Sequence, residues 1–266
     1  MKHEPQPLDL TLRQRASWLA HLFKALARQH HTGMLDVLTA LIPADAVVLD
    51  VGAHAGQFTK LFAALAPRGR VYAFEPSLYA RSILRQVVFW HRLKHVEVVA
   101  AGLADAAGDA DLVTPIKASG AIGFGLAHLG GDASGDARRD RVEVATLDRF
   151  AAARGLARID FIKADIQGSE IRLLRGGAET LARFRPAVLL ELTADDLRRA
   201  GADAAEAWQR FDRLAYRAFR WEPTADRPLW PAPAPAGDGD YLFADAQILP
   251  LLAPFIADLI ARPPHA

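Results

Sequence analysis

Apolar residues along the chain alternate between short continuous runs and longer stretches with helical spacing. The runs predict buried parallel strands over residues 47–51, 70–74, 96–100, 159–164 and 187–192. Apolar residues that recur every three or four positions predict helices over residues 58–65, 77–90, 147–156 and 169–184, the last interrupted at Gly176-Gly177. Because strands and helices alternate, we expect a parallel sheet with right-handed crossovers.

The two ends of the chain predict further elements. Residues 10–41 predict one or two helices that cover a sheet edge or the substrate mouth, with plain packing on the core as the simpler alternative. Their apolar positions recur at helical spacing: Leu12, Trp18, Leu19, Leu22, Phe23, Leu26, Leu35, Leu38 and Leu41. Toward the other end, a helix over 205–214 precedes a pair of strands over 216–221 and 241–243. The segment 223–240, rich in Pro, Ala and Gly, predicts a long exposed loop between these strands.

The middle of the chain has a looser pattern. Short strands are predicted at 111–114 and 142–145, and the second alternates as an edge strand does. Residues 132–140 are polar and charged. The glycine-rich segment 120–131 is long enough to be a lid or a substrate loop, and a mobile surface loop explains it equally well.

Together these elements predict an α/β fold with a doubly wound, seven-stranded, Rossmann-like sheet whose last strand is antiparallel. Residues 1–44 are expected to form an N-terminal helical extension packed on the core. Residues 45–266 are expected to form a single domain, because the sequence contains no internal repeat and no linker between independent units.

Composition and charge narrow the range of functions. The 266 residues are 51% hydrophobic and 24% charged, as in ordinary globular proteins. Lys and Arg number 32 against 31 for Asp and Glu, so a net charge of +1 gives no electrostatic footprint for a nucleic-acid partner. The absence of cysteine excludes disulfides, thiolate catalysis and Cys-based zinc sites.

The location of the protein is expected to be cytoplasmic. The first ten residues lack the apolar run of a signal peptide, and the apolar segment 249–260 is too short to span a bilayer. His21, His30 and His31 do not predict a metal site, since adjacent histidines point in different directions on a helix. No metal is expected elsewhere.

The stretch Asp-Val-Gly-Ala-His-Ala-Gly at residues 50–56 predicts a strand, a tight glycine turn and a helix start. Backbone N–H groups at a helix start suit the anionic end of a small ligand, and Asp50 could receive a cation or an amine. A dinucleotide motif has closer glycines and a later acid, so an NAD-dependent oxidoreductase is disfavoured. An acid followed by Gly52 and Gly56 resembles motif I of the class I S-adenosylmethionine-dependent methyltransferases.

Several acidic residues end predicted strands, namely Asp50, Glu75, Asp165 and Glu191. In open α/β sheets, ligands bind outside the carboxyl ends of the strands. Glu75 follows Asp50 by 25 residues and precedes Pro76. Its carboxylate could accept hydrogen bonds from the two adjacent hydroxyls of a ribose, with a plain surface charge as the alternative.

Six ordered motifs resemble the FkbM family of S-adenosylmethionine-dependent methyltransferases over roughly residues 45–245. They are Asp-Val-Gly-Ala-His-Ala-Gly at 50–56, Ala-Phe-Glu-Pro at 73–76, Val-Ala-Thr-Leu-Asp at 144–148, Phe-Ile-Lys-Ala-Asp-Ile-Gln-Gly-Ser-Glu at 161–170, Leu-Leu-Arg-Gly-Gly at 173–177 and Arg-Pro-Ala-Val-Leu-Leu-Glu-Leu at 185–192. The resemblance implies S-adenosylmethionine as the cofactor and O-methylation of a sugar, glycan or natural-product hydroxyl.

The resemblance also implies roles for individual residues. The methionine part of the cofactor would contact Asp50, Gly52, Ala53 and Gly56. The ribose would contact Glu75 and Pro76, and the adenine would be bordered by Gly102 and Leu103.

The methyl group would lie beside Asp165. Asp165 and His54 are the candidate bases, with Glu170 and Glu191 as second choices. The simpler alternatives are a helix N-terminal carboxylate for Asp165 and a residue merely tolerated in a turn for His54.

One departure from the family motif Asp-x-Glu-Gly-x-Glu concerns catalysis. Gln167 stands where the first Glu is usual, and an amide cannot take up a proton. The helix over 77–90 also lacks the family's frequent Asn-x-x-x-Asn, with Gln86 and Trp90 at the two positions. A non-catalytic module that binds S-adenosylmethionine or a partner is therefore the alternative function.

Overall fold

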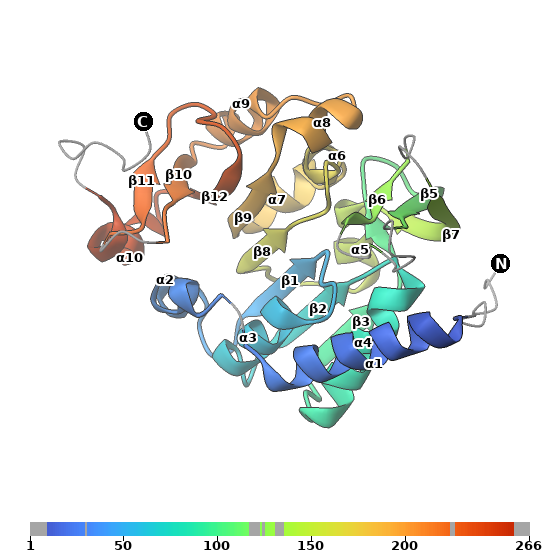
Figure 1. The fold of residues 1–266 in the computed structure, drawn as a ribbon. Coiled ribbons are helices and arrows are strands. Elements are labelled where there is room, and N and C mark those ends of the chain that lie inside the picture. Colours follow the sequence, from blue (N-terminus) through green and yellow to red (C-terminus); the bar gives the residue numbers. More distant parts are fainter. Residues whose placement is uncertain are drawn as a thin grey trace.

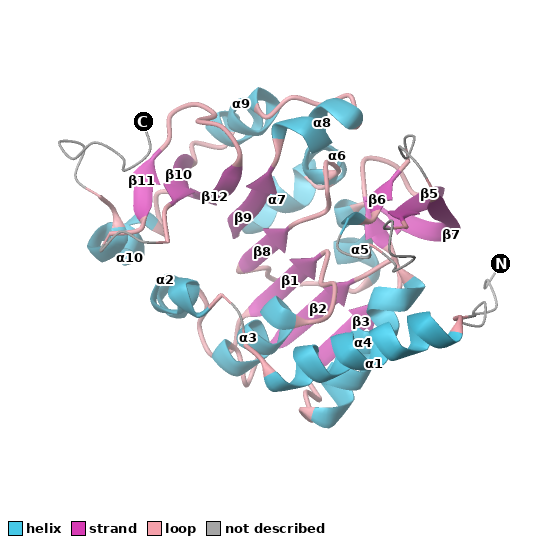
Figure 2. Ribbon diagram, viewed as in Figure 1, coloured by secondary structure: helices cyan, strands magenta, loops and turns pink. Residues whose placement is uncertain are grey.

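The computed structural model describes residues 10–29, 31–116, 123, 126–130, 136–223 and 227–257. A large sheet crosses the centre of the molecule with helices on both faces, and a smaller sheet lies at one side (Figures 1 and 2). The large sheet has eight strands in the order β11-β10-β12-β9-β8-β1-β2-β3. The predicted α/β fold and its doubly wound sheet are confirmed.

Five adjacent parallel strands form one side of the large sheet, up to its edge at β3: β1 Val47–Val51, β2 Arg70–Phe74, β3 Val96–Val99, β8 Phe161–Ala164 and β9 Ala187–Leu192. The remaining strands are β10 Arg217–Trp221, β11 Leu229–Pro231 and β12 Gly239–Ala244. β12 runs antiparallel between β9 and β10, in agreement with the expected antiparallel last strand.

The predicted strand count is wrong, because the sheet has an eighth strand inside the segment expected to be an exposed loop. In β11, Leu229 pairs with Trp221 of β10 and is fully buried. Only two consecutive apolar side chains, Leu229 and Trp230, mark this strand, and prolines flank them on both sides. Proline is tolerated there because β11 is an edge strand.

A second sheet contains β4 Gly102–Leu103, β5 Gly108–Pro115, β6 His128–Leu129 and β7 Ala137–Ala145, in the order β4-β7-β5-β6. Both predicted short strands exist and are longer than expected. β7 extends into the polar segment 132–140 because it pairs with β5 over its whole length. Half of the glycine-rich segment 120–131 lies outside the described residues, and the described half includes β6.

Helices between the strands have the following bounds: α3 Gln57–Leu65, α4 Leu78–Trp90, α5 Leu147–Ala153, α6 Glu170–Gly176, α7 Ala178–Phe184, α8 Ala194–Arg199, α9 Ala205–Arg213 and α10 Leu249–Leu252, with 3-10 turns at Thr32–Met34 and Ala253–Phe255. The predicted interruption at Gly176-Gly177 separates α6 from α7. A Cβ on Gly176 would lie 2.1 Å from the carbonyl oxygen of Ala104, so the small sheet approaches the backbone here.

The first helices, α1 Leu12–Ala27 and α2 Leu35–Leu41, occupy different places. α2 buries Leu38 and Leu41 in the core, whereas α1 packs on α4 and covers no sheet edge (Figure 1). Trp18 of α1 donates its indole N–H to Ser82 of α4 at 2.8 Å. Plain packing therefore accounts for α2 and for one side of α1, whereas Leu12, Leu19 and Phe23 of α1 are exposed.

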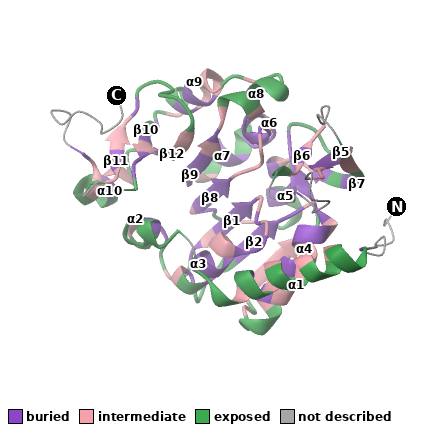
Figure 3. Cartoon of the chain, in the orientation of Figure 1, coloured by how far each residue is buried: buried purple, intermediate pink, exposed green. Residues whose placement is uncertain are grey.

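Two apolar layers hold the sheet between the helices. Alternate residues of a strand point to opposite faces, so Leu49 belongs to one layer and Val48 to the other. Figure 3 shows the central strands buried and much of α1 exposed. In the part of the chain that the structure describes, no helix is both long and apolar enough to cross a membrane.

Candidate active site

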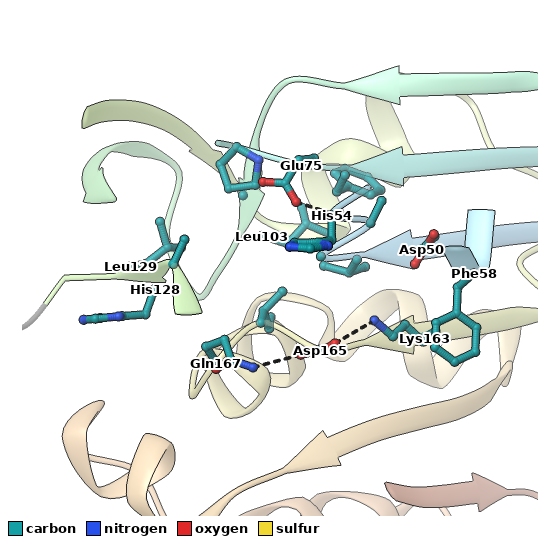
Figure 4. Close-up of a pocket in the computed structure, with 18 of the residues that line it drawn as sticks. Asp50, His54, Phe58, Glu75, Leu103, His128, Leu129, Lys163, Asp165 and Gln167 are labelled. Atoms are coloured by element: carbon teal, nitrogen blue, oxygen red, sulfur yellow. Dashed lines mark hydrogen bonds and ion pairs between the residues drawn. The ribbon is translucent and has the colours of Figure 1, made fainter. Parts of the chain in front are cut away.

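A cavity opens at the carboxyl ends of β1, β2 and β8 (Figure 4). Apart from Gly56 and the second-choice bases Glu170 and Glu191, every residue predicted for the site lines it: Asp50, Gly52, Ala53, His54, Glu75, Pro76, Gly102, Leu103 and Asp165. The other lining residues are His31, Val51, Gln57, Phe58, Phe74, Ala101, Leu112, Ala127, His128, Leu129, Lys163, Ile166 and Gln167. The topology thus brings together side chains that are more than one hundred positions apart in the sequence.

The turn after β1 is held against its neighbours by backbone contacts. Gly52 and Ala53 both donate their N–H groups to the carbonyl oxygen of Phe74, at 3.1 and 2.9 Å. Gly52 has φ +77°, and a Cβ there would lie 2.0 Å from the carbonyl oxygen of Asp165. Only glycine fits this position, because both the conformation and the space exclude a side chain.

Gly56 was predicted for the site, and the structure places it at the start of α3. It is the N-terminal cap of α3 with φ +84°, and it does not line the cavity. A Cβ there would lie 2.8 Å from the side chain of Leu84 on α4. The position therefore permits close packing of α3 and α4, and any effect on a ligand is indirect.

Asp50 is fully buried at the end of β1. One carboxylate oxygen accepts a hydrogen bond from the hydroxyl of Thr59 at 2.5 Å, and the other has no hydrogen-bond partner among the described residues. Burial raises the pKa of Asp50, and the charge of Lys163, opposite it on β8, opposes that rise. A buried carboxylate oxygen in a cavity wall suits a cationic donor on a ligand.

Glu75 ends β2 and organises the cavity wall. Its two carboxylate oxygens accept N–H bonds from the backbones of His54 and Ser77, both at 2.8 Å. Burial raises the pKa of Glu75 to about 7. Each oxygen keeps a second lone pair for a hydroxyl donor.

His54 has the left-handed conformation, φ +52°, which is uncommon for a residue with a side chain. Its N–H bond to Glu75 helps to hold this conformation. Burial lowers the pKa of the imidazole to about 4. The ring is therefore neutral at neutral pH and a weak proton acceptor.

Asp165 lies where β8 ends and connects two side chains at the cavity wall. Lys163 donates to one of its oxygens at 3.2 Å and Gln167 to the other at 3.1 Å (Figure 4). Burial alone would raise the pKa of Asp165, but the charge of Lys163 and these hydrogen bonds hold it below its usual value. Asp165 is therefore ionised at neutral pH.

Glu191 lies close enough to Asp165 for the charge of Asp165 to raise its pKa. It belongs to β9, where its partner across the sheet is Asp240 of β12. Burial, followed by the charges of Asp165 and Asp240, raises the pKa of Glu191 to about 8. At neutral pH this acid pair carries one proton, which belongs mainly to Glu191.

The sequence interpretation missed Lys163. Its ammonium lies 5.1 Å from the ring centre of Phe58 and is almost completely buried. The charges of Asp165 and Asp50 outweigh burial and raise its pKa, so it is a cation. The signal was a single lysine inside the apolar run of β8, since a buried charge requires a partner.

The small sheet supplies the far wall of the cavity. Gly102 and Leu103 of β4 were predicted there, and Leu129 of β6 belongs to the segment 120–131, for which a lid or substrate loop was one of the two interpretations. A Cβ on Gly102 would lie 3.2 Å from the side chain of Leu129, so the two strands are in contact. His128, beside it, is buried with its Nε2 atom unpartnered within the described residues.

A sequence profile of the FkbM methyltransferase domain matches residues 50–218. The chain belongs to the FkbM methyltransferase family. The matched segment contains all three strand-end carboxylates of the cavity and the whole of the small sheet.

Two curated proteins are similar to this FkbM chain in sequence. The AMB antimetabolite synthetase AmbE of Pseudomonas aeruginosa is 29% identical over 246 residues, which cover 73% of this chain and 12% of the synthetase. The 2-O-methyltransferase NoeI of Sinorhizobium fredii is 26% identical over 171 residues, which cover 56% of this chain and 65% of that enzyme. The chain therefore spans less than two thirds of either relative.

Solved structures with a similar arrangement include two methyltransferases. Methyltransferase FkbM from Methylobacillus flagellatus has a TM-score of 0.47 and 12% identity, over 85% of this chain and 58% of that one. The O-methyltransferase from Bacillus cereus, solved in complex with SAH, has a TM-score of 0.45 and 14% identity, over 89% and 92% of the two chains.

The FkbM motif after β8 has a structural explanation in this chain. Glu170 is buried outside the cavity lining, and its two oxygens accept the N–H groups of Ile166 at 2.8 Å and Gly168 at 3.0 Å. It holds the turn in place, so it is not a suitable base. Gln167 keeps a hydrogen bond to Asp165 although it cannot take up a proton.

Proposed function

We propose that this FkbM chain is an S-adenosylmethionine-dependent O-methyltransferase that acts on a hydroxyl of a sugar, glycan or natural product. The observation that carries the proposal is the convergence of Asp50, Glu75 and Asp165, from the ends of three adjacent strands, on one cavity. Transfer to oxygen is supported by the sequence similarity to NoeI, a 2-O-methyltransferase.

The cavity residues fit this cofactor. The unpartnered carboxylate oxygen of Asp50 suits the ammonium of the methionine part. The remaining lone pairs of Glu75 suit the two ribose hydroxyls, and Leu103 and Leu129 offer apolar surface to an adenine ring. When bound, S-adenosylmethionine supplies an electrophilic methyl group for in-line displacement by oxygen.

We assign the proton acceptor to the Asp165–Glu191 pair. Asp165 lines the cavity, where a carboxylate oxygen can accept the proton of an acceptor hydroxyl as its oxygen forms the new bond to carbon. When both acids are ionised, above about pH 8, the pair becomes a well-matched base. His54 is the weaker candidate because its conjugate acid has a pKa of about 4.

Titration calorimetry tests the cofactor assignment. We expect the wild type to bind S-adenosylmethionine, and Asp50→Asn and Glu75→Gln each to weaken binding by about tenfold or more, since each loses a charge-assisted bond. Glu97→Gln is the control, because Glu97 pairs with Arg70 and Arg154 outside the cavity. No binding by the wild type, or undisturbed binding by both variants, would refute the assignment.

Methyl transfer from labelled cofactor to a panel of hydroxylated sugars, glycans and natural products tests the activity. Turnover that rises as the pH passes about 8, and that is lost in Asp165→Asn, is the expected result. Cofactor binding without transfer to any acceptor would favour the non-catalytic module. That alternative derives from Gln167, which removes one carboxylate from the cavity wall.

A further inference from the structure

Helix α1 exposes a continuous apolar face to solvent. Leu12, Ala16, Leu19, Phe23 and Ala27 recur at intervals of four, three, four and four residues, which places them on one side of the helix. All five are exposed, and the three large side chains have 85%, 61% and 73% of their surface accessible. This face, from here on the outer face of α1, is larger than an isolated exposed leucine.

The opposite side of α1 accounts for its place in the fold. Trp18 and Leu22 pack with buried Ala25 against α4, where Trp18 also donates to Ser82. The helix is therefore apolar on both sides, and packing on α4 explains only one of them. The outer face points away from the body of the molecule (Figures 1 and 3).

Charges around the outer face all have one sign. At 100° per residue, Arg13 and Lys24 lie along one flank and Arg15 along the other, while α1 contains no Asp or Glu. All three cations are exposed. A helix with three cations and no acid is unexpected in a chain with 32 basic and 31 acidic residues.

The helix beneath α1 has the same composition. Between Leu78 and Trp90, α4 contains no acid; its Arg85 is exposed, whereas Arg81 is half-buried and donates to the carbonyl oxygens of Glu75 and Pro76. It ends in Phe89 and Trp90, which are exposed and contact each other edge to face at 5.6 Å between ring centres. The two packed helices thus combine exposed apolar side chains with positive charge.

We propose that α1 docks this protein on an anionic lipid surface, with the outer face in the headgroup region and Arg13, Arg15 and Lys24 against the lipid charges. An apolar stripe between cationic flanks is the arrangement of interfacial helices. Aliphatic Leu12 and Leu19 offer no platform for stacking bases, which disfavours RNA. In a two-fold dimer through this face, the cationic flanks of two copies would repel each other.

The structure connects this face to the candidate active site. The ammonium of Lys60, on α3, donates to the carbonyl oxygens of Ala25 and Arg28 at the end of α1, both at 2.7 Å. Since α3 follows the turn that lines the cavity, a docked α1 would hold the cavity in a fixed orientation to the lipid surface. The inference does not depend on the proposed reaction.

Vesicle flotation of the full chain tests the proposal. We expect the wild type to float with vesicles of equal parts phosphatidylglycerol and phosphatidylcholine and to bind pure phosphatidylcholine about tenfold or more weakly, since one partner charge is absent. Leu19→Ser combined with Phe23→Ser should reduce binding to the anionic vesicles by about tenfold or more. Leu251→Ser, at an exposed leucine of α10, is the matched control and should bind as the wild type.

A second variant and a second measurement guard against misfolding. Arg13→Gln with Lys24→Gln keeps the apolar face, and it should weaken binding and flatten its dependence on salt. Three results would overturn the proposal. The first is that the wild type does not float with anionic vesicles, and the second is that the double variant at Leu19 and Phe23 floats as well as the wild type. The third is a wild-type dimer in sedimentation that the double variant at Leu19 and Phe23 converts to a monomer.

Discussion

Gly52 and the backbone of Asp165 touch: a Cβ on the glycine would lie 2.0 Å from the carbonyl oxygen of the aspartate. The two turns that follow β1 and β8 therefore meet without any side chain between them. Asp50 and Asp165, which flank these turns, are held at one wall of the cavity by this contact.

Replacing Gly52 by alanine should damage both folding and ligand binding. The left-handed φ and the collision with Asp165 together should lower the free energy of unfolding by about 2 to 5 kcal/mol. Denaturant unfolding and cofactor calorimetry measure the two effects. Gly33→Ala is the matched control and should cost less than about 1 kcal/mol, since its φ is not positive and nothing lies within 4 Å of the added Cβ. Equal stability of Gly52→Ala and the wild type would contradict the observed contact.

Replacing Lys163 by methionine should destabilise the protein strongly. The variant keeps the length of the side chain but leaves Asp165 and Asp50 without their nearby cation, at a cost of about 3 to 5 kcal/mol. The exposed Lys94, changed to methionine, controls for loss of a charge as such. If chemical denaturation gave the same loss of unfolding free energy for Lys163→Met and Lys94→Met, the buried arrangement of charges would be refuted.

Stability should fall as the pH rises because of Glu170. Burial raises its pKa from 4.5 to about 7, so the folded state retains a proton that the unfolded state has released. The stability that the retained proton gives to the folded state is present in full below pH 4.5. It is lost as the pH rises through about 7, which lowers the free energy of unfolding by on the order of 3 kcal/mol. Between pH 5 and pH 8, the free energy of unfolding should therefore decrease less for Glu170→Gln than for the wild type.

Glu97→Gln provides the control for this pH dependence. Ion pairs with Arg154 and Arg70 outweigh burial and lower the pKa of Glu97, so its titration lies below this pH range. Glu97→Gln should leave the decrease in unfolding free energy between pH 5 and pH 8 unchanged. Glu75 titrates in the same range as Glu170, so some decrease should persist in Glu170→Gln. An identical decrease in wild type and Glu170→Gln would disprove the assignment.

The titration of Glu191 should depend on Asp165. Its pKa of about 8 results from burial and then from the charge of Asp165, so Asp165→Asn should lower it by about one unit or more. Carbon-13 NMR of the glutamate carboxyl group measures this directly and requires no knowledge of the acceptor. Asp240→Asn should produce a smaller decrease. A pKa unaffected by Asp165→Asn would mean that burial alone determines it, and the pair would lose its role as a base.

The central strands were predictable because a strand buried on both faces must be apolar at almost every position. The small sheet was less evident, since β5 and β7 have one exposed face and include the charged residues Asp111 and Arg141, which pair across the ladder. β11 was missed because it has only three residues, one of them Pro231, and because its pairing with β10 defines it and not a pattern of its own.

The site carboxylates were predictable because acids at the ends of parallel strands meet at one edge. Lys163 was not predictable, since one of its two acidic partners, Asp50, lies beside it only through the register of β1 and β8. Helical periodicity predicted that α1 is apolar but could not distinguish the side on α4 from the outer face. A repeat of apolar residues identifies a helix and does not say how many neighbours it has.

The far wall of the cavity belongs to a separate sheet, and this has an evolutionary consequence. β6 shares its hydrogen-bond ladder with β5 and none with the strands that hold Asp50, Glu75 and Asp165. Substitutions or changes of length around Leu129 can therefore alter what fits opposite these carboxylates without disturbing their strands. The shape of this wall can diversify in such a protein while the arrangement of its strand-end carboxylates stays the same.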